Sequence, residues 1–430
     1  LGNLSAAIQY GLSNSAEPQG THRLLRITDI QDGEVDWNAV PLTTVNDPEA
    51  YLLKTGDIVF ARTGATVGKS FLITETPYPS VYASYLIRIR LLGSLSPEYI
   101  YQFFDSACYW SQITDKSVGV GQPNCNGTSL KELFIPLPPI SEQLRIVPTA
   151  QALLAYVAKI DAEKKSLLSI IMATKSKILD LAIRGQLIPQ DPNDEPASVL
   201  LERIRAEKEE LIKQGKIKRD KKESVIFRGE DNSYYLNNGQ TTVDINDDLP
   251  FDIPDSWRWV RLKDVFIINP RNKLDDDLDV SFIPMPLIDD GYSGKHATDV
   301  RHWKEVKNGF THFAEGDVGV AKITPCFENR KSTVFENLTN GYGAGTTELH
   351  VLRPFGNNIF VRYLLAYIKS DYFVEKGKQT FTGDVGQQRI SKAYVENAYF
   401  PLPPVKEQER IVQQIGIIFE FLNMITDALS

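Results

Sequence analysis

The sequence predicts an α+β protein with two duplicated globular domains, separated by long helices that pair as a coiled coil. Three observations predict this fold. One motif occurs twice, a long stretch suited to a helix follows its first occurrence, and short strand-like and helix-like segments precede each occurrence. With 430 residues, the chain is long enough for about two to four domains of ordinary size.

The internal repeat is the strongest signal in the sequence. Residues 134–147, FIPLPPISEQLRIV, recur as residues 399–412, YFPLPPVKEQERIV, at an offset of 265 positions. Upstream, Gly56–Arg62 corresponds to Gly316–Lys322 at an offset of 260 positions. Matches that keep this order over most of a domain indicate a duplication rather than a chance similarity of proline-rich strings.

The two copies differ at their ends. Residues 253–262, IPDSWRWVRL, introduce the second copy and have no counterpart before Leu1. The second copy stops at Ser430, partway through the segment that follows the motif in the first copy. We therefore expect the natural chain to continue beyond both ends of this sequence.

A long helix is predicted after the first motif. Ser141 is a suitable N-cap, and residues 141–184 contain no glycine and one proline, Pro148, near the start. At 1.5 Å per residue, such a helix would be roughly 65 Å long. Gly185, with Pro189 just beyond it, predicts the end of the helix.

Apolar residues in this segment have heptad spacing. Eight of the ten seam positions between Ala150 and Leu181 are apolar, and the same register gives five apolar positions between Ile415 and Leu429. This pattern favours two long helices packed on each other, and a bundle within one globular domain is the alternative.

A linker is predicted between the copies. A second helix is expected from Ser198 to about Lys213, followed by a basic run to Lys222. Residues 202–222 carry a net charge of +4, which suits either a solvated linker or an arm that contacts phosphate or a partner. Aspartates between Asp244 and Asp255 then lead into the second copy.

Each globular copy mixes strands with helices. Asp57–Ala61 and Tyr85–Leu91 are expected as strands. Pro97–Phe104 is expected as a helix capped by Ser96, and its counterpart in the second copy is Ile359–Lys369.

Composition and charge restrict the class of protein. Three cysteines without a CxxC pair argue against a disulfide framework and a zinc site, and favour a reducing cytoplasm. The sequence contains no run of 18 or more apolar residues, so it predicts no membrane-spanning helix. The net charge of −8 is unfavourable for a chain that would hold nucleic acid by itself.

Gly64–Ser70, GATVGKS, resembles a phosphate-binding loop. That pattern requires four residues between its glycines and a helix after the loop, whereas three residues and a strand-like segment stand here. A glycine-rich hairpin that presents Arg62, Thr63 and Lys69 is the preferred interpretation, and a nucleotide-binding enzyme is the alternative. No catalytic triad, paired-carboxylate or GxGxxG motif is found, and the histidines fit no common metal pattern.

The chain resembles the specificity subunits of type I restriction–modification enzymes. The resemblance rests on the doubled PLPP-x-x-EQ motif, on residues 177–192, KILDLAIRGQLIPQDP, and on residues 193–202, NDEPASVLLE. It covers essentially the whole chain, although the second helical segment is short.

The resemblance implies a division of labour along the chain. Two target-recognition domains would each read one half of a bipartite double-stranded DNA site, and the helices would pair antiparallel as a spacer. The expected segments are target-recognition domain 1 at 1–140, a central helical region and linker at 141–230, target-recognition domain 2 at 231–400, and a distal helical region at 401–430.

The resemblance also implies partners and cofactors. Two modification subunits would dock on the helices and methylate adenine with S-adenosylmethionine, and restriction or motor subunits would use ATP and Mg²⁺. This chain would have no cofactor, metal or catalytic residue, and would act in the prokaryotic cytoplasm without contacting a membrane. A structural coiled-coil adaptor without DNA contact is the remaining alternative.

Candidate binding residues follow from the loops of each copy and from the doubled motif. Glu348 is expected to accept a hydrogen bond from cytosine N4. The DNA-binding candidates are Arg62, Thr63, Lys69, Ser84, Tyr85, Gln122, Asn124, Lys322, Thr324, Arg330, Lys331, Thr347, Glu348, Gln387 and Arg389, and the partner-docking candidates are Glu142, Gln143, Arg145, Glu407, Gln408 and Arg410.

Overall fold

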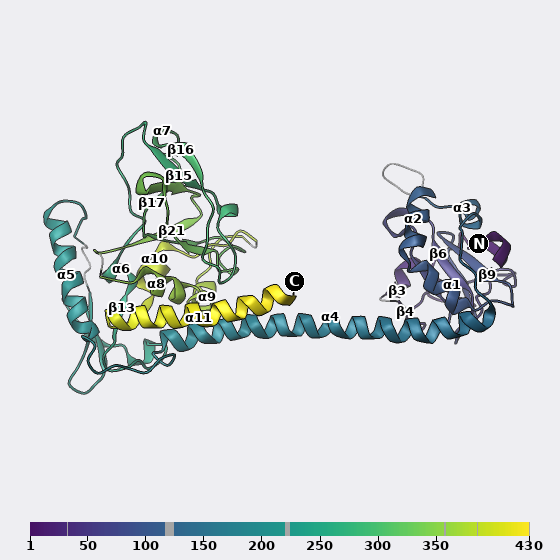
Figure 1. Ribbon diagram of the computed structural model, residues 1–430, viewed down its shortest axis with the longest axis horizontal. Coiled ribbons are helices and arrows are strands. Elements are labelled where there is room, and N and C mark those ends of the chain that lie inside the picture. Colours follow the sequence, from purple (N-terminus) through teal and green to yellow (C-terminus); the bar gives the residue numbers. More distant parts are fainter. Residues whose placement is uncertain (32, 117–123, 220–223, 357, 385, 430) are drawn as a thin grey trace. The chain divides into compact units, whose positions relative to one another are not determined.

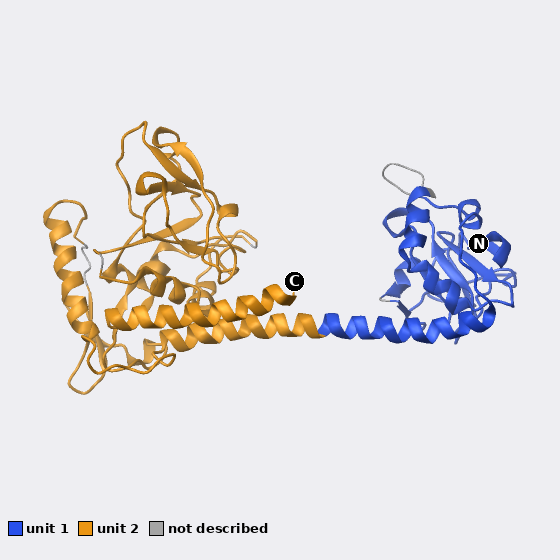
Figure 2. Ribbon diagram, in the orientation of Figure 1, with its two compact units in different colours: residues 1–162 blue, residues 163–430 orange. Residues whose placement is uncertain are grey.

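The computed structural model describes residues 1–31, 33–116, 124–219, 224–356, 358–384 and 386–429. The chain forms two compact units, unit 1 at residues 1–162 and unit 2 at residues 163–430 (Figure 2). Both units mix helices and strands, as predicted (Figure 1). Each unit is described by itself below.

Unit 1 contains a four-stranded antiparallel sheet in the order β1-β9-β6-β7, a three-stranded sheet β5-β2-β8 and a small hairpin β3-β4. Its strands are β1 Ser5–Tyr10, β2 His22–Leu25, β3 Ile30–Gln31, β4 Glu34–Val35, β5 Leu42–Thr43, β6 Ile58–Ala61, β7 Ser70–Leu72, β8 Ser80–Tyr82 and β9 Leu86–Leu91. Its helices are α1 Pro97–Phe104, α2 Ala107–Lys116, α3 Gly127–Lys131 and the first part of α4 Ile140–Ile183.

Unit 2 contains two four-stranded sheets, β14-β21-β18-β19 and β16-β15-β20-β17, with the smaller sheets β10-β11-β12 and β13-β22. Its strands are β10 Val225–Arg228, β11 Tyr234–Asn237, β12 Thr242–Asp244, β13 Arg258–Arg261, β14 Phe266–Ile268, β15 Asp279–Ile283, β16 Asp299–His302, β17 Thr311–Ala314, β18 Val318–Ala321, β19 Ser332–Val334, β20 Tyr342–Gly345, β21 Leu349–Pro354 and β22 Tyr399–Leu402. Its helices, besides the end of α4, are α5 Ala197–Lys213, α6 Leu262–Val265, α7 Trp303–Val306, α8 Val361–Ile368, α9 Asp371–Lys378, α10 Lys392–Asn397 and α11 Val405–Leu429.

The sheets repeat the duplication seen in the sequence. The order β1-β9-β6-β7 in unit 1 matches β14-β21-β18-β19 in unit 2, strand for strand. A parallel pair accompanies each of these sheets, β2 with β8 and β15 with β20. The repeat is therefore one of topology as well as of motif.

The predicted local elements form for the expected reasons. All four residues of β6 are buried, as are the first four of β9, because these central strands are covered on both faces. Ser96 caps α1, since its hydroxyl accepts a hydrogen bond from the backbone N–H of Tyr99 at 3.2 Å. The counterpart α8 begins at Val361, within the predicted range.

The predicted long helix is α4, which has 44 residues and includes Pro148. It begins at Ile140, so Ser141 lies in the first turn instead of capping the helix. The end is as predicted, because Gly185 takes up the left-handed conformation with φ +69°.

Within unit 2, the end of α4 packs against α11, and the two helices run antiparallel (Figure 1). Ile178 and Leu179 share a core with Ile411 and Ile415. Beside this core, the Lys175 ammonium donates to Asn423 Oδ1 at 2.6 Å. Of the predicted seam residues, Ile178 and Ile415 are thus buried in this core.

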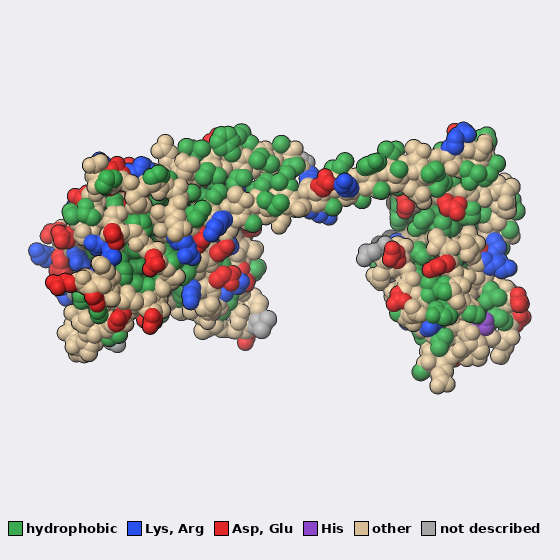
Figure 3. All heavy atoms as spheres, turned by 90° about the horizontal axis from the view of Figure 1, so that it is seen from below, with side chains coloured by type: hydrophobic (Ala, Val, Ile, Leu, Met, Phe, Trp, Pro, Cys, Tyr) green, Lys and Arg blue, Asp and Glu red, His purple; other side chains and the backbone are tan. Residues whose placement is uncertain are grey.

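The earlier part of α4 leaves its seam exposed in the described structure. Leu153 is 61% exposed and Ile160 is 63% exposed, while Ile171 further along is buried. Hydrophobic side chains along the helices are visible in the space-filling view (Figure 3). The apolar surface here exceeds what a helix facing only solvent would carry.

The segment between the copies is more ordered than the sequence suggested. The antiparallel sheet β10-β11-β12 spans the predicted boundary between the linker and target-recognition domain 2, with β10 in the predicted linker and β11 and β12 just after it. Ile226 and Ile245 are buried with Trp259 in a small core, which holds this sheet onto β13.

Candidate functional site

The first candidate site lies beside the ends of β6 and β9 in unit 1. We call Arg62, Thr63, Tyr85 and Asn124 the first rim. Three chain segments meet there, because Arg62 N–H donates to Tyr85 O at 3.1 Å and Cys125 N–H donates to Arg62 O at 3.0 Å. Thr63 and Asn124 also form a backbone bridge. Residues far apart in the sequence therefore line one edge.

Arg62 is the most distinctive side chain of the first rim. Its guanidinium lies over the ring of Tyr10, 4.9 Å from the ring centroid. Its Nε is buried and donates to no acceptor among the described residues. Tyr10 was not predicted as a site residue, and an aromatic residue at the end of a strand gives no signal in sequence that would have identified it.

The second candidate site occupies the equivalent place in unit 2. We call Lys322, Thr324, Glu348 and Arg389 the second rim. Lys322 N–H donates to Glu348 O, Ile390 N–H donates to Lys322 O, and Thr324 N–H donates to Gln388 O, each at 2.9 Å. The first two bonds have direct counterparts in the first rim, so the same three segments are held in the same way.

The side chains of the second rim are charged and paired. Arg389 Nε and Nη2 donate to the two carboxylate oxygens of Glu348 at 2.9 and 3.0 Å. The hydrogen bond from Arg389 is the largest influence holding the pKa of Glu348 below its ordinary value, and the charge of Lys322 adds to it. Both Glu348 oxygens already accept from Arg389, so Glu348 is not the free acceptor for a cytosine amino group that the sequence had suggested.

The framework beneath the rims is the same in both units. Asp57 accepts from Arg90 Nε and Nη2 at 2.7 and 2.6 Å, and Asp317 accepts from Arg353 Nε and Nη2 at 2.8 and 2.7 Å. Each pair joins the turn before a central strand to its neighbour strand. The two copies thus share the same aspartate–arginine pair beneath the rim, whereas equivalent positions in the two rims carry different residues.

The glutamine of the doubled motif is part of this framework. Gln143 Oε1 accepts from Ser96 N–H at 3.1 Å, and Gln408 Oε1 accepts from Phe360 N–H at 2.9 Å. The amide nitrogens donate back to Pro138 O and to Pro403 O. Both glutamines are buried, so they fix the start of the helix against the domain.

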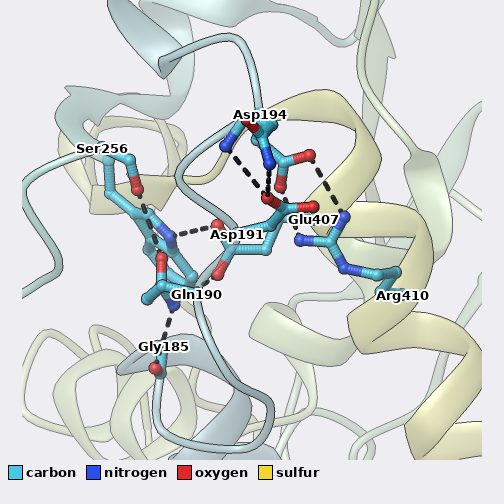
Figure 4. A network of polar contacts seen from close by, with 9 residues as sticks. Gly185, Gln190, Asp191, Asp194, Ser256, Glu407 and Arg410 are labelled. Atoms are coloured by element: carbon cyan, nitrogen blue, oxygen red, sulfur yellow. Dashed lines mark hydrogen bonds and ion pairs between the residues drawn. The ribbon is translucent and has the colours of Figure 1, made fainter.

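The two copies differ in the glutamate and arginine of the motif. In unit 2, Glu407 is 1% exposed and accepts from Trp257 Nε1 at 2.9 Å and from Gln190 Nε2 at 2.6 Å (Figure 4). Arg410 makes two hydrogen bonds to the buried carboxylate of Asp194. Burial raises the pKa of Glu407.

In unit 1, by contrast, Glu142 and Arg145 are exposed. Partner docking stays a prediction for all six residues. The structure shows that four of them, Gln143, Glu407, Gln408 and Arg410, make intramolecular contacts.

Several predicted DNA-binding residues lie apart from the rim contacts. Arg330 donates from Nε to Lys369 O and pairs with Asp371, and Lys331 donates to Ile288 O at 2.7 Å. Lys69 and Thr347 are exposed, Ser84 is half-buried, and Gln122 lies outside the described residues. Gln387 is exposed too, but its backbone oxygen accepts from Arg389 of the second rim.

The Gly64–Ser70 segment is a hairpin connection. After a short 3₁₀ turn at Gly64–Thr66, the chain enters β7, which pairs antiparallel with β6. The helix required after a phosphate-binding loop is therefore replaced by a strand. Among the described residues, no cluster of three or more His, Cys, Asp or Glu side chains is arranged to hold a metal ion. No helix within the described ranges of the chain is long and apolar enough to cross a membrane.

Comparisons with known proteins agree with the repeated architecture. The family described as "Type I restriction modification DNA specificity domain" matches residues 17–170 and 254–427, once in each copy. The chain belongs to this family. The match to both copies explains why the rims and the glutamine contacts recur.

Curated members of the specificity-subunit group are similar over part of the chain. The EcoAI specificity subunit of Escherichia coli is 48% identical over 243 residues, which is 56% of this chain and 38% of the relative. The EcoKI specificity subunit of Escherichia coli is 30% identical over 217 residues, which is 47% of each chain. The chain thus matches less than half of the length of these relatives.

Solved structures share the fold. The HsdS subunit of Thermoanaerobacter tengcongensis has a TM-score of 0.54 and 17% identity, with 100% of this chain and 90% of that chain covered. A chain from a structure of type I R-M complex assembly has a TM-score of 0.55 and 17% identity, with 99% and 93% covered.

Proposed function

We propose that this chain is the DNA-specificity subunit of a type I restriction–modification complex, in which each rim reads one half of a bipartite site. The observation that carries the proposal is the contrast between framework and rim. Equivalent backbone bonds hold both rims, while Arg62, Tyr85 and Asn124 are replaced by Lys322, Glu348 and Arg389. A duplicated scaffold with different polar residues at one edge suits the reading of two different base sequences.

The helices are proposed to act as the spacer between half-sites and as a docking surface. We infer that α4 and α11 belong to an antiparallel coiled coil, since their buried seam residues share one core in unit 2. The exposed apolar residues of α4, such as Leu153 and Ile160, are suited to contact with modification subunits. Exposed Glu142 and Arg145 lie at the start of the same helix.

Catalysis is assigned to the partners. Methylation with S-adenosylmethionine and ATP- and Mg²⁺-dependent cleavage would be supplied by modification and restriction subunits, while this chain supplies the base preference. Because the net charge is −8, we expect weak DNA binding by the chain alone and stronger binding once partners add phosphate contacts.

The test is selection of bound duplexes from a randomised library by the chain assembled with its modification subunits. The proposal predicts two short specified blocks separated by an unspecified gap of fixed length. A complex that forms but selects no sequence would refute the proposal and favour an adaptor without DNA contact.

A further inference from the structure

The second rim presents one guanidinium in a fixed orientation. Arg389 donates from Nε and Nη2 to the two oxygens of Glu348, and from Nη1 to Gln387 O at 2.8 Å. A guanidinium has five N–H donors. These three bonds leave one donor on Nη1 and one on Nη2.

Bidentate pairing restricts how this group can move. A guanidinium held by both oxygens of a carboxylate is fixed in plane and in direction, unlike a single flexible contact. The backbone of Arg389 is also fixed, because it exchanges two hydrogen bonds with Thr382 and is bridged to Ile323. The side chain of Arg389 nevertheless stays 38% exposed.

The remaining donors match the acceptors of one base. Guanine presents O6 and N7 side by side in the major groove, and an arginine that donates to both is the commonest specific contact to that base. The other three bases lack this pair of adjacent acceptors. A phosphate contact would need no carboxylate to orient the arginine, and a nearby carboxylate would oppose the approach of a phosphate.

We propose that Arg389, oriented by Glu348, is a specificity-determining residue that reads a guanine in the half-site bound by unit 2. This inference rests on the proposed DNA-reading function. Glu348 is a positioning residue, since it acts through Arg389. In the first rim the residue equivalent to Arg389 is Asn124 and that equivalent to Glu348 is Tyr85, so this guanine contact is specific to unit 2.

The experiment compares variants of the full chain, each assembled with its modification subunits, by selection on randomised duplexes. Arg389→Lys keeps the charge but removes the pair of parallel donors, so we expect preference for guanine at one position to fall by about 5- to 150-fold. Glu348→Gln should weaken the preference at that same position while Arg389 remains. Arg362→Lys is the matched control, because Arg362 pairs with Glu336 on the same unit away from the rim.

The possible outcomes distinguish failure of the guanine assignment from failure of the proposed DNA-reading function. Loss of preference at a single position in one half-site, with the control unchanged, supports the assignment. A bipartite preference that survives both rim variants at every position overturns the assignment alone. Uniformly weaker binding with a shallower salt dependence would mean a phosphate contact and would also overturn it. A wild-type complex without any preference overturns both. If Arg389→Lys fails to assemble, Glu348→Gln decides.

Discussion

Replacing Glu407 by alanine should destabilise unit 2, whereas the equivalent change at Glu142 should have little effect. Both residues occupy the same place in the doubled motif. Glu407 is buried and accepts from Trp257 and Gln190, while Glu142 is exposed. The duplication therefore supplies a control with the same sequence context and a different environment.

The size of the effect follows from the two hydrogen bonds. Each bond to an ionised acceptor contributes roughly 1.5–3 kcal/mol. Alanine would leave the buried indole N–H of Trp257 unpaired, whereas the amide of Gln190 is exposed and can donate to water instead. Part of this is offset, because burial of the carboxylate is unfavourable and raises the pKa of Glu407. We expect Glu407→Ala to lower the free energy of unfolding by about 2–4 kcal/mol. Glu142→Ala should change it by less than about 0.5 kcal/mol.

Urea unfolding followed by tryptophan fluorescence measures this difference. Trp257 belongs to the network, so its environment reports directly on unit 2. Two variants with the same unfolding midpoint would refute the role assigned to the Glu407 network.

Further predictions concern pH, the ion pairs and docking. Burial raises the pKa of Glu407 above 4.5 in the folded chain, so the folded state binds this proton more tightly than the unfolded state does. The wild type should therefore lose stability relative to Glu407→Gln as the pH rises above about 4.5. Parallel curves of stability against pH for the two proteins would contradict this. Asp317→Asn should destabilise the chain by about 3–5 kcal/mol, because Asp317 is 1% exposed and the substitution leaves Arg353 without its carboxylate partner. Thermal unfolding measures this loss, and Asp57→Asn should cause the same loss in unit 1 by removing the partner of Arg90. Arg145→Glu should weaken binding of a modification subunit, measured by titration calorimetry, and leave the stability of the chain unchanged. Arg410→Glu should instead destabilise the chain, because it places a second carboxylate beside Asp194. Binding by the Arg145 variant that equals that of the wild type would show that Arg145 is not part of the docking surface.

Local patterns explain which parts of the fold could be predicted. The strands at Asp57 and Tyr85, the capped helix after Ser96 and the long helix after the first motif depend on nearby residues, and each forms within a residue or two of its predicted bounds. The sheet β10-β11-β12 was missed because its segment has a polar and acidic composition. That sheet depends on burial of Ile226 and Ile245 against Trp259, a contact that no local pattern reveals.

The candidate site shows the same limit. Arg62 and Asn124, like Lys322 and Arg389, could be proposed from their loops, and the structure brings each pair to one edge through backbone hydrogen bonds. Arg330 has the same loop signature, yet its guanidinium is engaged by Lys369 O and Asp371. Which of several basic loop residues remains available is decided by tertiary contacts, so it could not be derived from residue type alone.

The central claim is that each unit reads one half-site independently. It is tested most directly by exchanging residues 1–140 for the corresponding segment of another member of the family and determining the sites selected by the assembled complex. The account predicts that one specified block changes while the other block and the gap stay the same. A change in both blocks, or in neither, would contradict it.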